Sequence, residues 1–280
     1  MPEEHRDKTH EEESGDVEMV EGTEGTQNTT THEGDADTEL PFADAGAEEE
    51  PAAVHTSFIS YLSSPVVTLL IGKEEPTVLT AHQALLLQSP YFQDACKGFI
   101  EDAAPRQIEL PDDDIDAVGC FLEFLYTGEY FPRKLPGQRV LESHASIPTV
   151  DNTGEQLLKH ARIYTLAEKF GVGSLRTLAS SKIHCVNSTA KGEIAYARYV
   201  YTYTEKDDTT IRAPVASFWA TRSHTLRAEA EDEFKALCLE RPDFAYDILT
   251  RVLDDKLRRE QKMHPGTASG RKRARQSTGA

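Results

Sequence analysis

Hydrophobic positions along the chain change their spacing near Ser64, where a polar amino-terminal stretch gives way to short apolar runs. The β-branched and apolar run 66–71 stops at a charged turn, and a second run of the same type covers 77–81. Two such runs around a turn predict a β-hairpin. Residues 107–110 alternate polar and apolar side chains, which predicts a third strand.

Apolar residues three and four positions apart predict helices that each turn one face toward a core. The predicted helices cover 82–88, 91–97, 115–126, 157–170 and a segment after Ser174. The acidic run 112–114 stands where carboxylates cap the free N–H groups of the third of these helices, so we interpret it as a cap and not as a metal site. Residues 131–156 contain several prolines and glycines and predict an extended loop.

Short motifs between about 64 and 185 carry the strongest signal in the sequence. Each is weak alone, but their order and spacing are specific and cover a little under half of the chain. Together they resemble a BTB/POZ domain. The residues that carry this resemblance are Val66–Ile71, Val78–His82, Leu85, Leu86, Ser89–Phe92, Ile108–Leu110, Phe121, Leu122, Phe124–Gly128, Tyr164, Leu166, Ala167 and Phe170.

The resemblance implies an α+β fold, in which a small mixed sheet is packed by helical hairpins, and a module that binds other proteins. The part that follows, 188–257, is similar to the all-helical extension of many fungal BTB proteins. Many members of the family form homodimers through a helix and a strand that precede the first sheet strand. Here only about 58–62 precedes Val66, and Pro65-Val66 stands where the family usually has Asp. Monomer and dimer therefore both stay open.

Four residues are candidate contacts for a protein partner: Tyr91, Phe92, Phe99 and Glu101. Tyr91 and Phe92 are most economically core residues, yet exposed aromatic side chains often anchor interfaces. Phe99-Ile100-Glu101 resembles the hydrophobic-x-Glu motif through which some BTB domains bind a cullin scaffold of ubiquitin ligases. Phe99 would fill an apolar pocket while Glu101 forms a charged hydrogen bond. The alternative is that Phe99 packs on its own domain and Glu101 is solvated.

Charge divides the chain into a mildly acidic middle and two oppositely charged ends, with a net charge of −18. Residues 1–55 hold 18 acidic and two basic side chains and few large apolar ones, so we expect a disordered acidic tail. The expected BTB/POZ domain covers 56–187 and includes the loop 131–156. The helical extension follows over 188–257, and a basic disordered tail covers 258–280.

The basic tail suggests an alternative function, that of a nuclear regulator associated with chromatin or transcription. Its two clusters resemble a bipartite nuclear import signal and contain Arg258, Arg259, Arg271, Lys272, Arg273 and Arg275. The tail would contact an import receptor or nucleic acid. It has no aromatic residue to stack on bases, and the rest of the chain is acidic, so nucleic acid is not expected as the main partner. We expect the protein in the nucleus, the cytoplasm or both.

The motifs of catalytic sites, phosphate-binding loops and metal centres are absent from the sequence. We therefore expect no enzyme, catalytic residue, metal, cofactor or small-molecule substrate. His82 has no partner at ligand spacing, and Cys96 and Cys120 fall on apolar helix faces as small hydrophobes. The longest apolar runs have four residues and no secretory signal opens the chain, so a reduced intracellular protein is expected. The predicted function is a protein-binding adaptor or scaffold, with itself or a cullin scaffold as the candidate partner.

Overall fold

The computed structural model describes residues 57–99 and 105–263, and within these ranges three strands form one sheet. β1 (Val66–Ile71) is central, with β2 (Thr77–His82) antiparallel on one side and β3 (Gln107–Leu110) parallel on the other. Val66 lies opposite His82 in the hairpin, which fixes its register. The predicted hairpin and the predicted mixed sheet are both confirmed.

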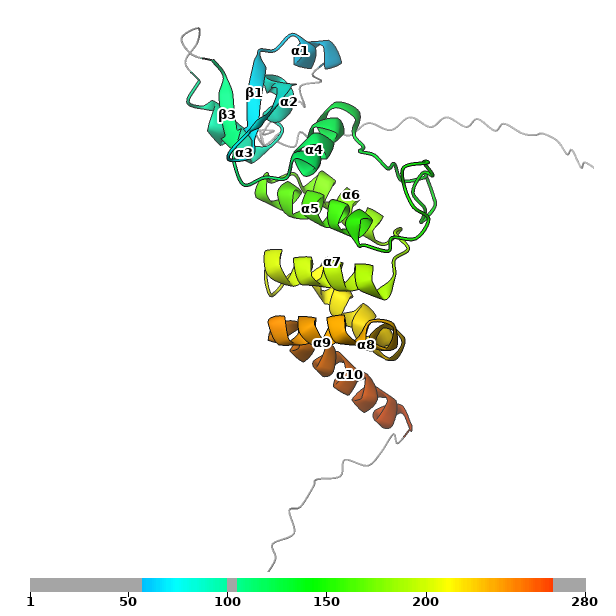
Figure 1. The fold of residues 1–280 in the computed structure, drawn as a ribbon. Helices are drawn as coiled ribbons and strands as arrows, with labels where there is room; N and C mark the ends of the chain where they lie inside the picture. The colour runs from blue at the N-terminus through cyan, green and yellow to red at the C-terminus, as the bar shows by residue number, and fades with distance from the viewer. Residues whose placement is uncertain (1–56, 100–104, 264–280) are drawn as a thin grey trace, which may run out of the picture. The chain divides into compact units, whose positions relative to one another are not determined.

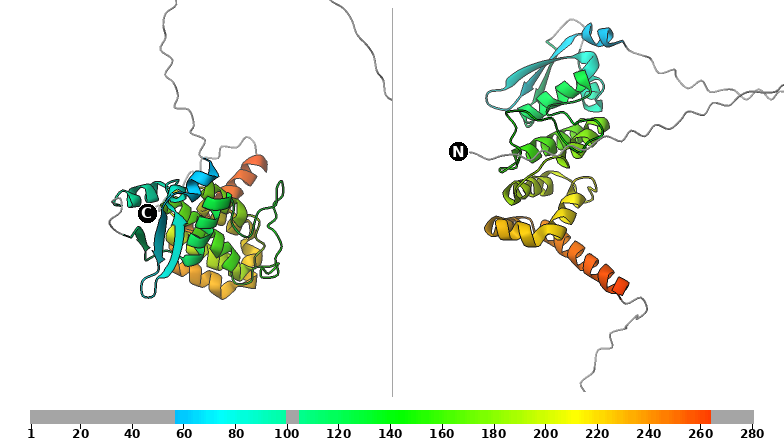
Figure 2. Two further views of the ribbon diagram at one scale, coloured as in Figure 1. Left: turned by 90° about the horizontal axis from the view of Figure 1, so that it is seen from above. Right: turned by 90° about the vertical axis from the view of Figure 1, so that its right-hand side faces the viewer.

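Helices make up the rest of the regular structure in the described part (Figure 1). They are α1 (Phe58–Leu62), α2 (Gln83–Leu86), α3 (Pro90–Cys96), α4 (Ile115–Thr127), α5 (Glu155–Lys169), α6 (Gly173–Ile183), α7 (Ala190–Tyr203), α8 (Arg212–Glu229), α9 (Glu231–Glu240) and α10 (Pro242–Met263). Because α5 contacts both α4 and α7, the helices follow the sheet as successive layers (Figure 2). The all-helical carboxy-terminal part is thus confirmed.

The core beside the sheet is built from alternate strand residues and a cluster of three phenylalanine rings. β1 turns Val67, Leu69 and Ile71 inward, as the period of two along a strand requires. The ring of Phe92 from α3 stacks on Phe121 from α4 at 5.6 Å between centroids. Phe170 closes the cluster at 4.9 Å from each of these two rings. All three rings are fully buried.

Asp114 begins α4 as the sequence predicts. Its carboxylate accepts a hydrogen bond from the Ala117 backbone N–H at 3.0 Å, and it forms an ion pair with Arg162 of α5 at 3.5 Å. The first acid of the run, Asp112, pairs with Lys73 at 2.6 Å, and Asp113 pairs with Lys169 at 2.7 Å. The interpretation of the run as a cap is confirmed for Asp114, while its two neighbours bind lysines.

Lys182 of α6 holds the start of the connection between α4 and α5. The Nζ atom of this fully buried lysine donates to the backbone carbonyls of Tyr130 at 2.5 Å and Pro132 at 2.7 Å, and it pairs with Glu129 at 2.5 Å. The Tyr130 hydroxyl in turn lies 2.9 Å from Nδ1 of the buried His160. The predicted loop 131–156 therefore has a fixed base, and it ends slightly early because α5 begins at Glu155.

The junction between the sheet domain and the helical extension is closely packed around Asp151. One carboxylate oxygen of this buried side chain accepts from the backbone N–H groups of Gln156 and Leu157 at the start of α5. Its backbone carbonyl accepts from the Ser188 hydroxyl at 2.9 Å, just before α7. Gly154 approaches α7 so closely that a Cβ atom there would stand 2.8 Å from the Gly192 carbonyl oxygen.

The extension has its own aromatic core. Trp219 of α8 stacks on Phe234 of α9 at 5.2 Å and meets Phe244 of α10 edge-on at 5.8 Å. The guanidinium of buried Arg212 pairs with Asp243 and lies 4.0 Å above the ring of Tyr201, so α7, α8 and α10 are tied together at one end.

α10 is longer than the sequence predicts. The expected boundary between the extension and the basic tail lies at 257/258, but the helix continues to Met263. Arg258 and Arg259 are therefore helical, exposed residues and not part of an extended tail. The last turns hold Lys256, Arg258, Arg259 and Lys262, whose positive charge suits the carboxy-terminal end of a helix. This favours continuation of the helix.

Candidate protein-interaction surfaces

α1 is held at its carboxy-terminal end by polar contacts and by Tyr61, which is partly buried and packs against the core. The Ser64 hydroxyl donates to the Tyr61 carbonyl at 2.7 Å and accepts from the Ala84 N–H at 3.1 Å, which ties the end of α1 to α2. The Pro65 carbonyl accepts from the Gln83 N–H at 2.8 Å. None of the five residues of α1 is buried. The surrounding chain therefore positions this short helix.

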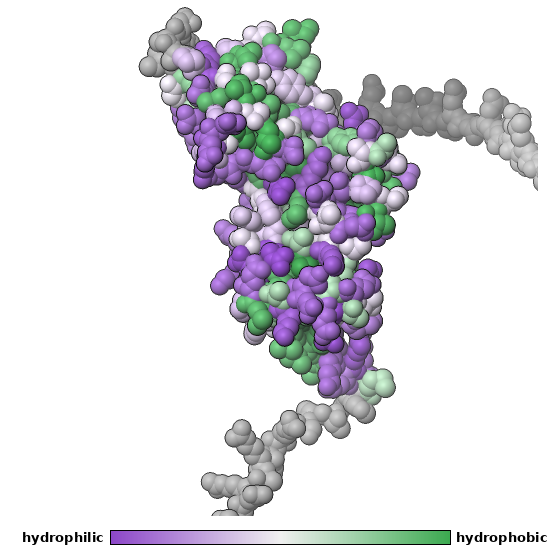
Figure 3. All heavy atoms as spheres, in the orientation of Figure 1, coloured by the Kyte–Doolittle hydropathy of each residue, from purple (hydrophilic) through white to green (hydrophobic). Residues whose placement is uncertain are grey.

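The outer side of α1 is apolar. Ile59 is 75% exposed, and Phe58, Leu62 and Val66 are each between two fifths and three fifths exposed. Hydrophobic surface is visible over α1 in Figure 3. Residues 57–72 contain no charged side chain. An apolar, uncharged surface of this kind is the usual character of an interface core.

Phe92, one of the predicted partner contacts, is a core residue. Ser89 accepts a hydrogen bond from its N–H at 3.5 Å and donates to the Phe170 carbonyl at 2.6 Å, and this turns the Phe92 ring inward. With no exposed area, Phe92 cannot touch a partner, so its prediction as a contact is wrong and its alternative as a core aromatic holds. Burial of a hydrophobic ring at this position stabilises the fold more than its exposure at the surface would.

Tyr91 and Phe99 are both half-buried. The Tyr91 ring lies 4.9 Å from the Phe170 ring, and Nζ of Lys169 lies 5.7 Å from its centroid. Phe99 follows α3 and packs against the core, with its N–H donating to the Cys96 carbonyl at 3.0 Å. Both rings keep an exposed part. Glu101, the other member of the cullin-like motif, lies outside the described residues.

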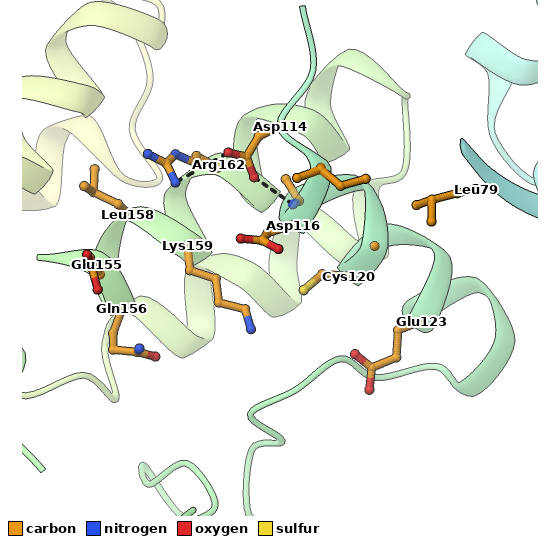
Figure 4. Close-up of a pocket in the computed structure, with 13 residues that line it drawn as sticks. Leu79, Asp114, Asp116, Cys120, Glu123, Glu155, Gln156, Leu158, Lys159 and Arg162 are labelled. Carbon is orange, nitrogen blue, oxygen red and sulfur yellow. Dashed lines mark hydrogen bonds and ion pairs between the residues drawn. The ribbon is translucent and has the colours of Figure 1, made fainter. Parts of the chain in front are cut away.

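A groove of about 770 Å³ lies between α4 and α5, as Figure 4 shows. α4 contributes Asp116, Cys120 and Glu123 to its wall, and Lys159 and Arg162 face them from α5. The lining is more polar than apolar: charged side chains predominate, and Leu79, Ile115 and Leu158 complete the wall. This pattern suits a polar protein segment better than a buried small molecule, whose sites are mostly apolar.

The titratable groups near the groove do not form a nucleophile with a base. Burial raises the pKa of the Cys120 thiol, so the thiol form is favoured over the reactive thiolate. Nδ1 of His82 lies 2.7 Å from the Tyr126 hydroxyl at the start of α2, the strand-to-helix junction at which the sequence places it. In the described ranges, no group of three or more His, Cys, Asp or Glu side chains is arranged to hold a metal ion.

A second cleft, of about 550 Å³, lies where the α4–α5 connection meets the extension. It is lined by apolar side chains from α5 to α8 and by Arg139, Glu193 and Arg222. Burial raises the pKa of Glu193 to about 7; Asp151 adds to this shift and Arg222 opposes it. No local pattern predicts this cleft, because its walls come from segments far apart along the chain.

None of the helices in the described part is long and apolar enough to cross a membrane. No curated protein matches this sequence. The family whose model matches the chain is the BTB/POZ domain, over residues 66–184. This match begins at the first residue of β1 and ends one residue after α6, so it covers the mixed sheet, the phenylalanine cluster and the α5–α6 hairpin. Residues 66–184 of this chain therefore form a BTB/POZ domain, a protein-interaction module.

Proposed function

We propose that the chain is an adaptor or scaffold that holds proteins together through its BTB/POZ domain. The observation that carries this proposal is the exposed apolar surface of α1 and Val66, which belongs to a stretch of 16 residues without charge. Exposed apolar area of this kind is unfavourable in water and is stabilised when another protein covers it. Catalysis is not part of the proposal.

The occupant we propose for the α1 surface is a second copy of the chain. Many BTB/POZ domains pair through the helix and strand that precede the sheet, and α1 is what this chain has at that place. α1 has only five residues, so the pair would bury less area than a longer helix allows. We therefore expect a weak, concentration-dependent dimer rather than a permanent one.

Sedimentation of the full chain over a range of concentrations tests the α1 pair. Ile59→Glu should weaken self-association through α1 at least tenfold, because this pair would bury two unpaired carboxylates. Leu239→Glu on α9, which is exposed to the same degree but lies far along the chain, is the matched control and should change nothing. Equal association of wild type and Ile59→Glu would remove α1 from the proposal.

A cullin scaffold is the unlike partner that we propose for the segment after α3. Phe99 keeps part of its ring exposed beside α3, and its motif partner Glu101 supplies a charge two residues later. In this arrangement the ring fills an apolar pocket of the cullin, and the carboxylate fixes the orientation by a charged hydrogen bond. Tyr91, half-buried on the same helix, would add contact area.

Binding of the full chain to the purified amino-terminal domain of a cullin tests this step. Glu101→Lys should reduce binding at least tenfold without a change in folding, whereas Phe99→Ala also removes a ring that packs on the core. Glu109→Lys, an exposed acid on β3, is the matched charge control. A wild-type chain that does not bind removes the cullin, while the BTB/POZ assignment stands.

Nuclear import is a further part of the proposal and rests on the basic residues at the carboxy-terminal end. Arg258 and Arg259 are exposed on α10, and the second cluster, Arg271–Arg275, lies outside the described residues. A fluorescent fusion of the full chain should collect in the nucleus, and Arg271→Ala with Lys272→Ala should leave it in the cytoplasm. Unchanged location would remove the import signal.

A further inference from the structure

α10 has two apolar faces, and only one of them is covered. Phe244 and Ile248 point into the extension and are buried against α8 and α9. Further along the same side, Asp255 and Arg258 face Ser217 and Thr221 of α8. The first part of this face is thus covered by the chain itself, while Asp255 and Arg258 further along stay at least half exposed.

The opposite face carries an apolar stripe with nothing over it among the described residues. Its members recur at spacings of three, four and four, which places them on one line along the helix. Each is more than half exposed; they are Tyr246, Leu249, Leu253 and Leu257. Hydrophobic surface runs along α10 in Figure 3, beside a hydrophilic strip. We call these four residues the α10 stripe.

The charges on α10 are divided by position along the helix. Its first 14 residues, 242–255, hold four acids and one base; its last eight, 256–263, hold four bases and one acid. The two parts thus carry net charges of −3 and +3. This order suits the dipole of a single helix. It also makes the helix its own electrostatic complement when a second copy runs in the opposite direction.

We infer that the α10 stripe is a self-association surface, on which two copies of the chain pair through antiparallel α10 helices. In this arrangement Leu253 lies beside Leu253 of the second copy at the two-fold axis, and Leu249 lies beside Leu257 of the second copy. The acidic part of each helix runs along the basic part of the other. A parallel pair would instead place like charges side by side along the whole helix.

The same surface patch serves both copies, as a two-fold interface requires. Its central leucines resemble the apolar seam of an antiparallel helix pair, in which every third or fourth residue is apolar. The inference is independent of the α1 surface. The α10 pair would form even if α1 bound only unlike partners. If the α10 pair does not form, the proposal for α1 is unaffected.

Disulfide trapping distinguishes the two directions of pairing. In an antiparallel pair centred at Leu253, two cysteines at 253 adjoin, whereas two at 249 are about 12 Å apart, because eight residues of helix rise by that distance. A disulfide requires Cα atoms within about 7 Å. In the full chain with Cys185→Ser and Cys238→Ser, Leu253→Cys should therefore cross-link under mild oxidation. Leu249→Cys should cross-link only when mixed with Leu257→Cys.

Leu239→Cys, exposed on α9, is the control for random collisions. A cross-link between two Leu249→Cys chains would overturn the antiparallel arrangement. Absence of any Leu253→Cys cross-link above the Leu239→Cys level would overturn the inference as a whole.

Sedimentation separates the α10 pair from the α1 pair. Leu253→Glu should remove association through α10, and Ile59→Glu should leave association through α10 intact. Only the double variant should therefore be a monomer at every concentration. Leu253 is exposed and faces away from α8, so circular dichroism should not change. If Leu253→Glu has the same mass as wild type throughout, α10 is not an interface.

Discussion

The BTB/POZ domain and the helical extension each pack three large aromatic rings together, but only the domain encloses its rings. Phe92, Phe121 and Phe170 have no exposed area and lie between the sheet and helices. In the extension, Trp219 and Phe244 are fully buried while Phe234 is partly exposed. The sheet closes the core of the domain on one side, where Val67, Leu69 and Ile71 of β1 are buried. The extension consists of helices, and among the described residues nothing covers the outer side of its last helix, so α10 keeps an exposed apolar face.

Removing one ring from each core should give the largest effects. Phe121→Ala and Trp219→Ala should each lower the free energy of unfolding by about 3–5 kcal/mol, the range for a fully buried aromatic side chain. Because α5 contacts both α4 and α7, we expect the two parts to unfold together. Chemical denaturation followed by circular dichroism measures both changes.

Trp219 is the only tryptophan of the chain, so its fluorescence reports on the extension alone. In Phe121→Ala, the fluorescence and circular dichroism transitions should still coincide. Two separated transitions would mean that the extension is stable without the BTB/POZ domain. Leu239→Ala is the exposed control, and it should change stability by less than about 0.5 kcal/mol.

A smaller effect is expected at the junction between the two parts. A Cβ atom on Gly192 would collide with the Ser188 hydroxyl and stand 2.8 Å from the Asp151 carbonyl oxygen, which belongs to backbone and cannot move freely. Gly192→Ala should therefore lower the free energy of unfolding by about 2 kcal/mol, as overpacking does. It should also separate the fluorescence and circular dichroism transitions.

Gly119→Ala on α4 is the matched control. A Cβ atom there meets nothing within 4 Å, so alanine should stabilise the helix by about 0.5–1 kcal/mol. If Gly192→Ala were as stable as Gly119→Ala, the junction would be looser than its contacts indicate.

Local patterns were enough to predict the sheet and most helices. The β-branched, apolar run 66–71 and the alternation in 107–110 predicted the strands, and the acids before Ile115 predicted the start of α4, because these signals act between residues close in sequence. The extent of α10 was missed, although Leu257 continues its apolar spacing. The junction was also missed: Gly154 and Gly192 matter through a contact made only after folding.

The candidate contacts were predictable only in part. Tyr91 and Phe92 are adjacent and aromatic, and which of them is buried depends on the facing rings from α4 and the end of α5. The uncharged run that contains α1 can be read from the sequence, but the exposure of its side chains depends on what packs nearby. The contacts of Lys182 could not be predicted for the same reason. No pattern in the neighbouring sequence indicates that its partners are carbonyls some fifty residues away.

The smallest effect we expect is a difference in how the two parts respond to pH. Burial lowers the pKa of His160 in the BTB/POZ domain to about 3, with Lys182 and Lys159 adding to the shift. Below its ordinary pKa of 6.5 the unfolded chain takes up a proton that the folded domain does not. The stability contributed by His160 is therefore full above pH 6.5 and is lost as pH falls from 6.5 toward 3. The loss should be about 1.4 kcal/mol at pH 5.5.

Glu193 acts in the opposite direction, since its raised pKa of about 7 adds stability as pH falls through 7 toward 4.5. The loss of stability between two pH values should therefore be compared in wild type and in His160→Leu. Both proteins contain Glu193, so its contribution cancels. Denaturation at pH 7.5 and 5.5 should show that wild type loses about 1.4 kcal/mol more than His160→Leu. His144→Leu, a change at an exposed histidine, should behave as wild type; equal losses in wild type and His160→Leu would mean that His160 is protonated in the folded domain.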